Sequence, residues 1–324
     1  NVLFVFRVVN IIYRLQALNY YKYYGAIMKK GICIAVLSAL FIPLLFSETA
    51  YDKFWNSMKA EDYDEAERCL VKWEKTKPKD AELYVAYFNY YIAKATAEQI
   101  RMETTPPDSG EYAEAKNESG DTIYLYSTTA YDDAFSEKAF AAIDKGLSYH
   151  PKRLDMYFGK AHFYYMRKEY SDQKELLKKV FALHKKYGGK WLWANNTPLE
   201  NTPVDFEETV HNYIAEWLGT KNQTAIECAR EIALLFVKDF PDNPVAYNDA
   251  GLAYSYLNDL EQAKKYYKAG YERDESDMIL LANLAYVCKH LGETDQAERY
   301  YSLMAKSDDT QYADFAKRQL ENLR

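Results

Sequence analysis

Cysteine, glycine and proline are scarce in this chain of 324 residues, which contains 4, 12 and 9 of them, respectively. Beyond residue 47 only Cys69, Cys228 and Cys288 occur, and they are far apart in sequence. No disulfide framework is therefore indicated, and we expect each thiol to pack as a small apolar group. With 48% hydrophobic residues, the low glycine and proline content favours a folded helical chain over a disordered one.

Familiar catalytic and metal-binding motifs are also missing from the sequence. It has no H-E-x-x-H, G-x-x-x-x-G-K-[ST], G-x-S-x-G or C-x-x-C segment. The five histidines are isolated from one another in sequence: His150, His162, His184, His211 and His290. We therefore predict no enzyme, no cofactor and no metal site.

The charge of the chain is acidic, with a formal net value of −7 at pH 7. Residues 1–47 contain five Lys or Arg and no Asp or Glu, so the rest of the chain carries 36 basic and 48 acidic residues, or −12. Nucleic acids and anionic lipid surfaces are bound mainly through cationic side chains. The charge thus predicts neither of them as a partner.

The segment 28–47 has the three parts of a secretory signal peptide. Met28-Lys29-Lys30 is a basic start, Gly31–Phe46 contains no charge, and Ser47 offers a small residue for cleavage. Sixteen uncharged residues are short for a membrane-spanning helix. We predict that residues 1–27 are an upstream extension before a start at Met28; the alternative is an N-terminus embedded in a membrane. The expected product is exported, periplasmic or extracellular if bacterial, with no membrane attachment after signal removal.

A repeat of 34 residues is the strongest pattern that the sequence does contain. When Pro244–Asp277 is aligned with Met278–Gln311, Ala263 falls on Ala297 and Tyr267 on Tyr301. A fixed period of this length indicates stacked units of two helices each. Weaker copies begin at Val210, Leu154 and Ala81, and Ala66 with Pro78 fits the second helix of an opening copy.

Each period has two helical faces separated by a short turn. Tyr247, Gly251 and Tyr254 are spaced as one face of a first helix, Leu257-Asn258-Asp259 forms the turn, and Ala263 and Tyr267 mark a second helix. A small residue such as Ala263 allows two helices to approach closely. Most of the 32 tyrosines fall at such packing places, so we interpret them as structural rather than as stacking sites for sugars or bases.

This arrangement resembles the tetratricopeptide repeat, whose pattern is W-x2-L-G-x2-Y, then A-x3-F, then P. Here the corresponding residues are Tyr247, Ala250-Gly251, Tyr254, Ala263 and Tyr267, while Glu275 departs from the proline. The resemblance covers 51–324 and implies an all-α, right-handed superhelix of about six helix pairs, closed by a polar helix at 312–323. We count it as one domain, because a solenoid has no separate cores.

Two insertions interrupt the regular spacing, at about 101–129 and 188–207. In the first, Glu111–Lys116 and Thr122–Ser127 flank a turn and predict a small β-hairpin, which should pack on the helices or on a partner. The first insertion also displaces the second helix of its repeat to Ala139. In the second, Trp191 and Trp193 occur among turn residues. They form either a plug over an apolar edge or a ligand contact, and we favour the plug.

The resemblance further implies a concave face that is lined by the first helix of each repeat and that grips a protein or peptide. By motif position its partner-binding residues would be Phe158, His162, Tyr165, Met166, Asn248, Leu252, Ser255, Tyr256, Tyr286, Lys289 and His290. Only Asn248 and Lys289 suit a carboxylate-binding set, which favours a peptide of low charge. The predicted function is an exported non-catalytic binding scaffold. The alternative is an enzyme or glycan-processing accessory whose site is formed by the two insertions over the groove.

Overall fold

The computed structural model describes residues 49–107 and 111–323. The predicted upstream extension and signal peptide lie outside these residues. The described part contains thirteen α-helices: α2 (Ala50–Lys59), α3 (Tyr63–Thr76), α4 (Ala81–Ala95), α5 (Asp133–Tyr149), α6 (Leu154–Met166), α7 (Tyr170–Tyr187), α8 (Phe206–Gly219), α9 (Gln223–Asp239), α10 (Pro244–Tyr256), α11 (Leu260–Tyr271), α12 (Met278–His290), α13 (Thr294–Met304) and α14 (Thr310–Glu321).

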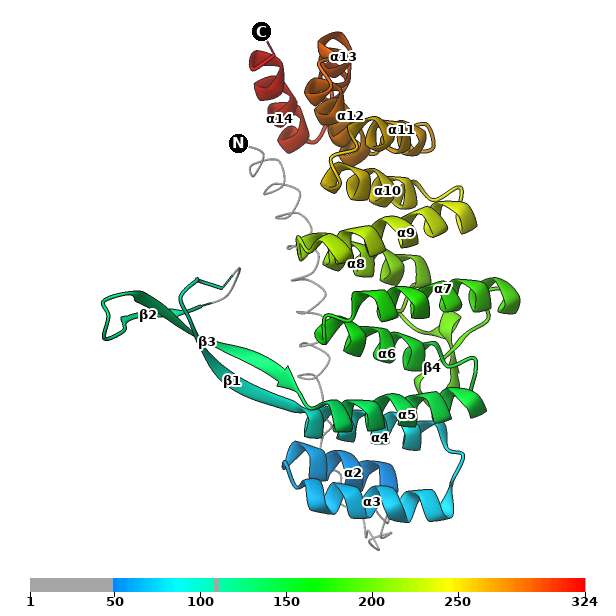
Figure 1. Cartoon of the computed structure of the whole chain (residues 1–324). Coiled ribbons are helices and arrows are strands. Elements are labelled where there is room, and N and C mark those ends of the chain that lie inside the picture. The colour runs from blue at the N-terminus through cyan, green and yellow to red at the C-terminus, as the bar shows by residue number, and fades with distance from the viewer. Residues whose placement is uncertain (1–48, 108–110, 324) are drawn as a thin grey trace, which may run out of the picture. The chain divides into compact units, whose positions relative to one another are not determined.

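Successive helices form six pairs, from α2 and α3 to α12 and α13, and α14 closes the stack, as Figure 1 shows. The sequence prediction of about six pairs and a closing helix is therefore confirmed. Three apolar clusters form the core along the stack. Tyr91 packs against the first two clusters along the chain and Leu252 against the last two, so the core has no sharp division.

The small-residue place of the repeat is buried in every second helix. The residues there are fully buried, at 0% exposure: Ala66, Ala139, Gln173, Ala229, Ala263 and Ala297. Ala139 confirms that the second helix of the interrupted repeat resumes after the first insertion. Gln173 is polar, and its Oε1 accepts a hydrogen bond from Trp217 Nε1 at 2.6 Å, which satisfies the carbonyl half of the amide, whereas its buried Nε2 has no hydrogen-bond partner among the described residues.

Local chemistry explains where the helices begin and turn. Asp259 caps α11 by accepting a hydrogen bond from the backbone N–H of Gln262. The turn within a repeat needs a residue with positive φ at one fixed place, where Lys168, Asn258 and Gly292 have φ of 61°, 60° and 78°. Asn and Gly adopt this conformation at little cost. The turn predicted at Leu257-Asn258-Asp259 thus has a backbone reason.

Tyrosines in the first helices connect each pair to the preceding turn. Tyr84 and Tyr247 donate hydrogen bonds from their hydroxyls to the carbonyl oxygens of Pro78 and Pro241, at 2.6 and 3.0 Å. Each proline stands six residues before its tyrosine. Their rings are nearly buried, so these tyrosines have the structural role that the sequence predicts.

The first insertion is larger than the predicted hairpin. It forms a three-stranded antiparallel sheet of order β1-β3-β2, with β1 (Thr96–Glu103), β2 (Ala113–Lys116) and β3 (Thr122–Tyr131). The strand β1 follows α4 directly and was missed, because its partner β3 lies more than twenty residues away and local pattern does not reveal that pairing. The sheet extends away from the helices in Figure 1, and Ile100 is 80% exposed. The predicted hairpin is present as β2 and β3, and its packing on a partner stays a prediction.

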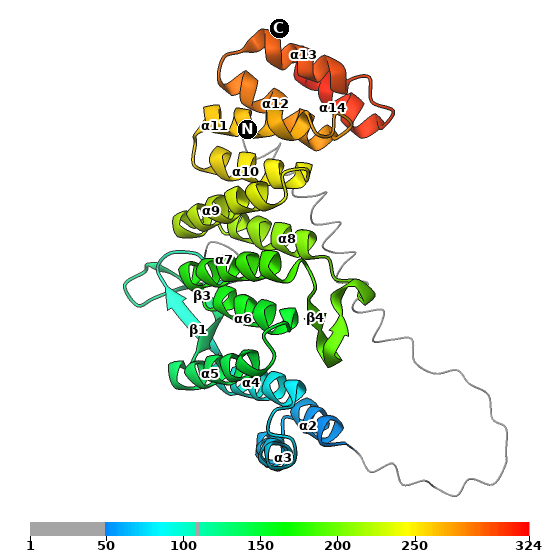
Figure 2. The ribbon, with the colours of Figure 1, turned by 90° about the vertical axis from the view of Figure 1, so that its right-hand side faces the viewer.

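The second insertion is short and irregular. It contains β4 (Leu192–Trp193) and β5 (Thr197–Pro198), which pair with each other, and two single 3-10 turns, η1 (Ala194–Asn196) and η2 (Leu199–Asn201). Helix α8 then starts at Phe206, four residues before the start of the repeat copy at Val210. In Figures 1 and 2 this insertion lies at the ends of α6 and α7 that are opposite to the β1–β3 sheet.

Candidate functional site

Two of the eleven predicted partner-binding residues are buried. Phe158 is 5% exposed and its ring packs against Phe206 and Tyr213. Asn248 is 4% exposed and its Oδ1 accepts a hydrogen bond from Asn283 Nδ2 at 2.8 Å. We therefore correct both assignments: these side chains hold neighbouring helices together, because the fifth place of the first helix faces the next pair.

The end of α6 presents a small accessible group. His162 and Met166 are exposed, and the ring of His162 stacks near that of Tyr165 at a centroid distance of 6.3 Å. Surrounding protein desolvates the imidazole and lowers the pKa of His162, which favours the neutral ring at pH 7. This group can offer aromatic and thioether surface and an uncharged hydrogen-bonding ring to a ligand.

The ends of α10 and α12 carry the remaining predicted residues. Leu252, Ser255 and Tyr256 on α10 are half-buried, and burial raises the pKa of Tyr256. Ser255 Oγ lies 3.2 Å from the hydroxyl of Tyr267, so it also supports the pair α10 and α11. These side chains are thus partly accessible to solvent, and Leu252 and Tyr256 also pack against the core.

On α12, Tyr286 and His290 form one unit. Their ring centroids are 3.9 Å apart, and His290 Nδ1 lies 2.8 Å from the Tyr286 carbonyl oxygen. His290 is exposed, whereas Tyr286 is half-buried. The neighbouring Lys289 donates a hydrogen bond from Nζ to Gln319 Oε1 of α14 at 3.5 Å. Lys289 is thus partly used to hold the closing helix.

The structure reveals a polar contact between first helices that isolated sequence positions did not predict. Asp249 of α10 is 1% exposed, and its carboxylate lies 2.9 Å from Nδ1 of His211 on α8. The nearby Asp249 carboxylate raises the pKa of His211 above its ordinary value, although burial of the ring opposes this effect. Because the two residues are 38 apart in sequence, only the helix stack brings them together.

Glu216 of α8 is a second functional candidate that was missed. Its side chain is exposed at the surface, yet desolvation by the surrounding protein raises its pKa to about 7. A carboxyl group with this pKa exists in both protonation states near neutral pH, and such groups occur at binding sites as well as in structural ones. No sequence motif marks it; the shift depends on the surroundings of α8.

The second insertion contributes a plug. Trp191 is 2% exposed, packs against Tyr157 and Tyr187, and donates a hydrogen bond from Nε1 to His184 Nδ1 at 3.1 Å. Trp193 is half-buried beside Phe158. This geometry agrees with the preferred plug for Trp191. Since the two insertions lie on opposite sides, it gives no support to a shared site formed by both.

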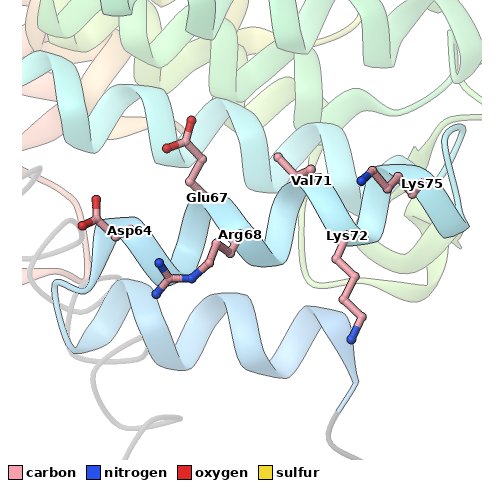
Figure 3. A pocket seen from close by; sticks show the side chains of 6 residues that line it. All are labelled: Asp64, Glu67, Arg68, Val71, Lys72 and Lys75. Atoms are coloured by element: carbon pink, nitrogen blue, oxygen red, sulfur yellow. The ribbon is translucent and has the colours of Figure 1, made fainter.

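One open hollow lies on the surface of α3. Figure 3 shows its lining side chains, all from this single helix: Asp64, Glu67, Arg68, Val71, Lys72 and Lys75. Its acidic side chains lie toward the start of α3 and its basic ones toward the end, and Arg68 already pairs with Glu65 at 2.7 Å. The hollow contains none of the predicted partner-binding residues.

No metal site, disulfide or membrane-spanning helix occurs in the part of the chain that the structure describes. No three His, Cys, Asp or Glu side chains are placed there to share a metal ion. Cys69, Cys228 and Cys288 are buried and free, as the sequence predicted. None of the described helices combines the length and apolar character that a bilayer crossing requires.

The contact between the two helices of a pair identifies the fold. A Cβ atom added to Gly251 of α10 would meet the ring of Tyr267 of α11, with Cδ1 at 2.5 Å. Ala263 is fully buried one turn earlier on α11, and Ala285, Ala297 and Tyr301 repeat this arrangement at 0 to 1% exposure in the next pair. These are the Gly, Ala and Phe places of the 34-residue pattern, now in contact. The chain has the fold of a tetratricopeptide-repeat protein.

Comparison with known proteins places this tetratricopeptide-like chain beside other helical solved structures. No family model and no curated protein matches it. It is similar to PilW, described as a widely conserved type IV pilus biogenesis factor, at 14% identity and a TM-score of 0.35 over 82% of this chain and 96% of PilW. It is also similar to YrrB, described as a TPR protein with an unusual peptide-binding site, at 13% identity and a TM-score of 0.39 over 77% and 97% of the two chains.

A third similar structure is pilF of Pseudomonas aeruginosa, at 11% identity and a TM-score of 0.35 over 83% of this chain and 96% of that one. At such low identity and TM-scores below 0.5, these likenesses carry no inference about partners. The function of this tetratricopeptide-like chain must be argued from its own residues.

Proposed function

We propose that this chain is a non-catalytic scaffold that binds a protein or peptide segment along the first helices of its repeats. The observation that carries the proposal is the accessible aromatic and histidine surface at the ends of α6 and α12, formed by His162 and Met166 and by Tyr286 with His290. Aromatic side chains commonly supply the energetic centre of a protein interface. Solenoids of this kind offer extended surfaces of this type.

The chemistry of these positions favours a segment of low charge with apolar side chains. Desolvation lowers the pKa of His162 and so favours its neutral form, and Tyr256 and Tyr286 offer aromatic surface. Lys289 is engaged with Gln319, so a carboxylate would gain little from it. The segment would be held mainly by apolar contact, with hydrogen bonds to the imidazole and phenol groups.

We also propose that the scaffold acts after export. The support is the pattern of residues 28–47, with its basic start, uncharged stretch and small residue before Glu48. Intact mass measurement of protein recovered from the extracytoplasmic fraction should give a chain that starts at or near Glu48. A recovered chain that still contains 28–46 would instead favour a membrane anchor.

Peptide selection tests the binding surface directly. Peptides selected from a random displayed library against the full chain should include apolar sequences, whose affinity is then measured by fluorescence anisotropy. The double variant Tyr256→Ala/His290→Ala should bind them at least tenfold more weakly. His290 is exposed, so its loss should alter stability by about 0.5 kcal/mol or less, whereas half-buried Tyr256 packs against the core and its truncation should lower the unfolding midpoint; circular dichroism at the assay temperature checks that the variant is still folded.

The matched control is Tyr112→Ala, which removes an aromatic side chain that is 46% exposed at the start of β2, away from these helices. Its peptide affinity should equal that of the wild type. If Tyr112→Ala weakens binding while Tyr256→Ala/His290→Ala does not, the binding surface lies elsewhere and this proposal fails.

A further inference from the structure

The turns that join one helix pair to the next lie along one side of the stack and contact each other in sequence order. His150 Nε2 lies 2.7 Å from the Lys79 carbonyl oxygen, which connects the turn after α3 with the turn after α5. The Leu192 N–H donates to the Lys152 carbonyl oxygen at 2.8 Å, which adds the segment after α7. These turns lie on one side in Figure 1.

The same side continues into the C-terminal half. The ring of His184, near the end of α7, lies 5.5 Å from that of Phe240 after α9. Arg273, after α11, donates from Nε to the Pro241 carbonyl oxygen at 2.5 Å. The turns after α3, α5, α7, α9 and α11 therefore form one continuous edge of the stack. The charge of this edge changes sign along its length.

The first three turns are basic. We define the lysine edge as six exposed lysines in and beside these turns: Lys77, Lys79, Lys152, Lys185, Lys186 and Lys190. None of the six has a carboxylate oxygen of a described residue within 4.0 Å of its ammonium group. Lys79 and Lys152 lie over the rings of Tyr149 and Tyr187, at 5.4 and 5.2 Å from the centroids, which leaves their positive charge at the surface.

Three carboxylates near the lysine edge, Glu74, Glu82 and Asp155, are paired with cations, whereas Asp80, Glu200 and Asp205 of the same turns have no cation of a described residue within 4.0 Å. Arg153, fully buried, holds Glu82 and Asp155 with ion pairs of 2.8 Å each. Glu74 accepts from Lys145 at 3.1 Å. With six such lysines against Asp80, Glu200 and Asp205, the local charge of this edge is positive in a chain whose net charge is −7.

The next two turns carry the opposite charge. We define the acidic edge as five carboxylates at and after the ends of α9 and α11: Asp239, Asp242, Glu272, Asp274 and Glu275. The cations of these turns are Lys238 and Arg273. The Arg273 guanidinium donates hydrogen bonds to the backbone carbonyls of Pro241 and Ala269, and it lies 3.9 Å from the centroid of the Tyr247 ring. Glu272 has only a distant, exposed contact with Lys268, at 3.9 Å.

One edge with a basic half and an acidic half is complementary to itself when it is turned by 180°. We propose that two copies of this chain pair along this edge in antiparallel orientation, so that the lysine edge of each copy faces the acidic edge of the other. A twofold axis uses both complementary halves at once and closes the assembly at two copies. Charge complementarity over such a surface accelerates and orients association, and salt weakens it because the groups are exposed.

A charge-swap experiment on the full chain tests this pairing. Sedimentation equilibrium should show dimers at about 50 mM salt and mostly monomers at about 500 mM, where screening acts over a shorter distance. The variant Lys77→Glu/Lys79→Glu/Lys186→Glu and the variant Asp242→Lys/Glu272→Lys/Glu275→Lys should each be monomeric alone. An equimolar mixture of the two should form a heterodimer at low salt.

The matched control reverses three exposed lysines at the opposite ends of the helices, Lys59→Glu/Lys168→Glu/Lys221→Glu, with the same change in net charge. It should dimerise as the wild type does, and circular dichroism should show that all variants keep their helices. A wild-type chain that is monomeric at low salt, or a mixture of swapped variants that stays monomeric, overturns the pairing. Oligomers that grow without limit with concentration would also overturn it, because they exclude a closed twofold pair.

Discussion

Replacing Gly251 with alanine gives a sharp test of how the helix pairs pack. The added Cβ would contact Cε1 of Tyr267 and lie 2.5 Å from Cδ1 and 2.9 Å from Cζ. The ring has little room to move, because Tyr267 is 2% exposed and its hydroxyl lies 3.2 Å from Ser255 Oγ. Overpacking of this kind costs about 1–3 kcal/mol, whereas alanine gains about 1 kcal/mol over glycine in a helix.

Gly219→Ala is the matched control, because Gly219 also lies in a helix, at the end of α8, and its added Cβ would meet no atom within 4 Å. Only the helix preference then acts, and the variant should be neutral or stabilised by up to ~1 kcal/mol. Gly251→Ala should therefore be less stable than Gly219→Ala by about 1–3 kcal/mol. At roughly 2–4 °C per kcal/mol for a chain of this size, thermal unfolding followed by circular dichroism resolves the difference.

A second measurement isolates the cause. In a Tyr267→Leu background the ring is absent, so Gly251→Ala should no longer be destabilising, and the two changes should couple by about 1 kcal/mol or more. Equal unfolding midpoints for Gly251→Ala and Gly219→Ala would refute the argument that the glycine place exists to admit the Tyr267 ring. An additive double variant would refute it as well.

Three further predictions concern other parts of the stack. Ala263→Leu should destabilise the chain by ~1–3 kcal/mol, since Ala263 is fully buried between helices, and an unchanged midpoint in urea would contradict the repeat register. Glu216→Gln should match the wild type at pH 4 and be more stable at pH 8. The folded pKa of Glu216, about 7, lies above its ordinary value, so the wild type loses stability as pH rises to about 7. Because Glu216 is exposed to solvent, we expect a difference of about 1 kcal/mol or less, and equal pH profiles for the two proteins would contradict the raised pKa. His211→Ala should cost ~3–5 kcal/mol, because Asp249 is left buried without the imidazole. An unchanged unfolding midpoint would contradict this role of the imidazole.

The amino-acid sequence alone determined the repeating part of this protein. The 34-residue period identified the small-residue place correctly in all six pairs, including Ala139 after a long insertion. It also located the turn at Asn258, where φ is positive. These features are local: helical periodicity, close approach at alanine and the tolerance of Asn and Gly for one backbone conformation act within a single unit.

The strands and the accessible surface were decided by contacts between distant residues. Thr96–Glu103 forms a strand only because it pairs with Thr122–Tyr131, and no feature within its own eight residues required that. Motif position placed Phe158 and Asn248 on the binding surface, but the next helix pair buries both.

The same limit applies to the charged groups. The partner of His211 lies 38 residues away, and the alternation of basic and acidic turns becomes one edge only when the pairs stack. Periodicity fixes which face of a helix is apolar, because one helix and its neighbour in sequence suffice for that. Which polar side chains become buried, paired or exposed depends on the stacking of successive pairs, and that is a property of the tertiary structure.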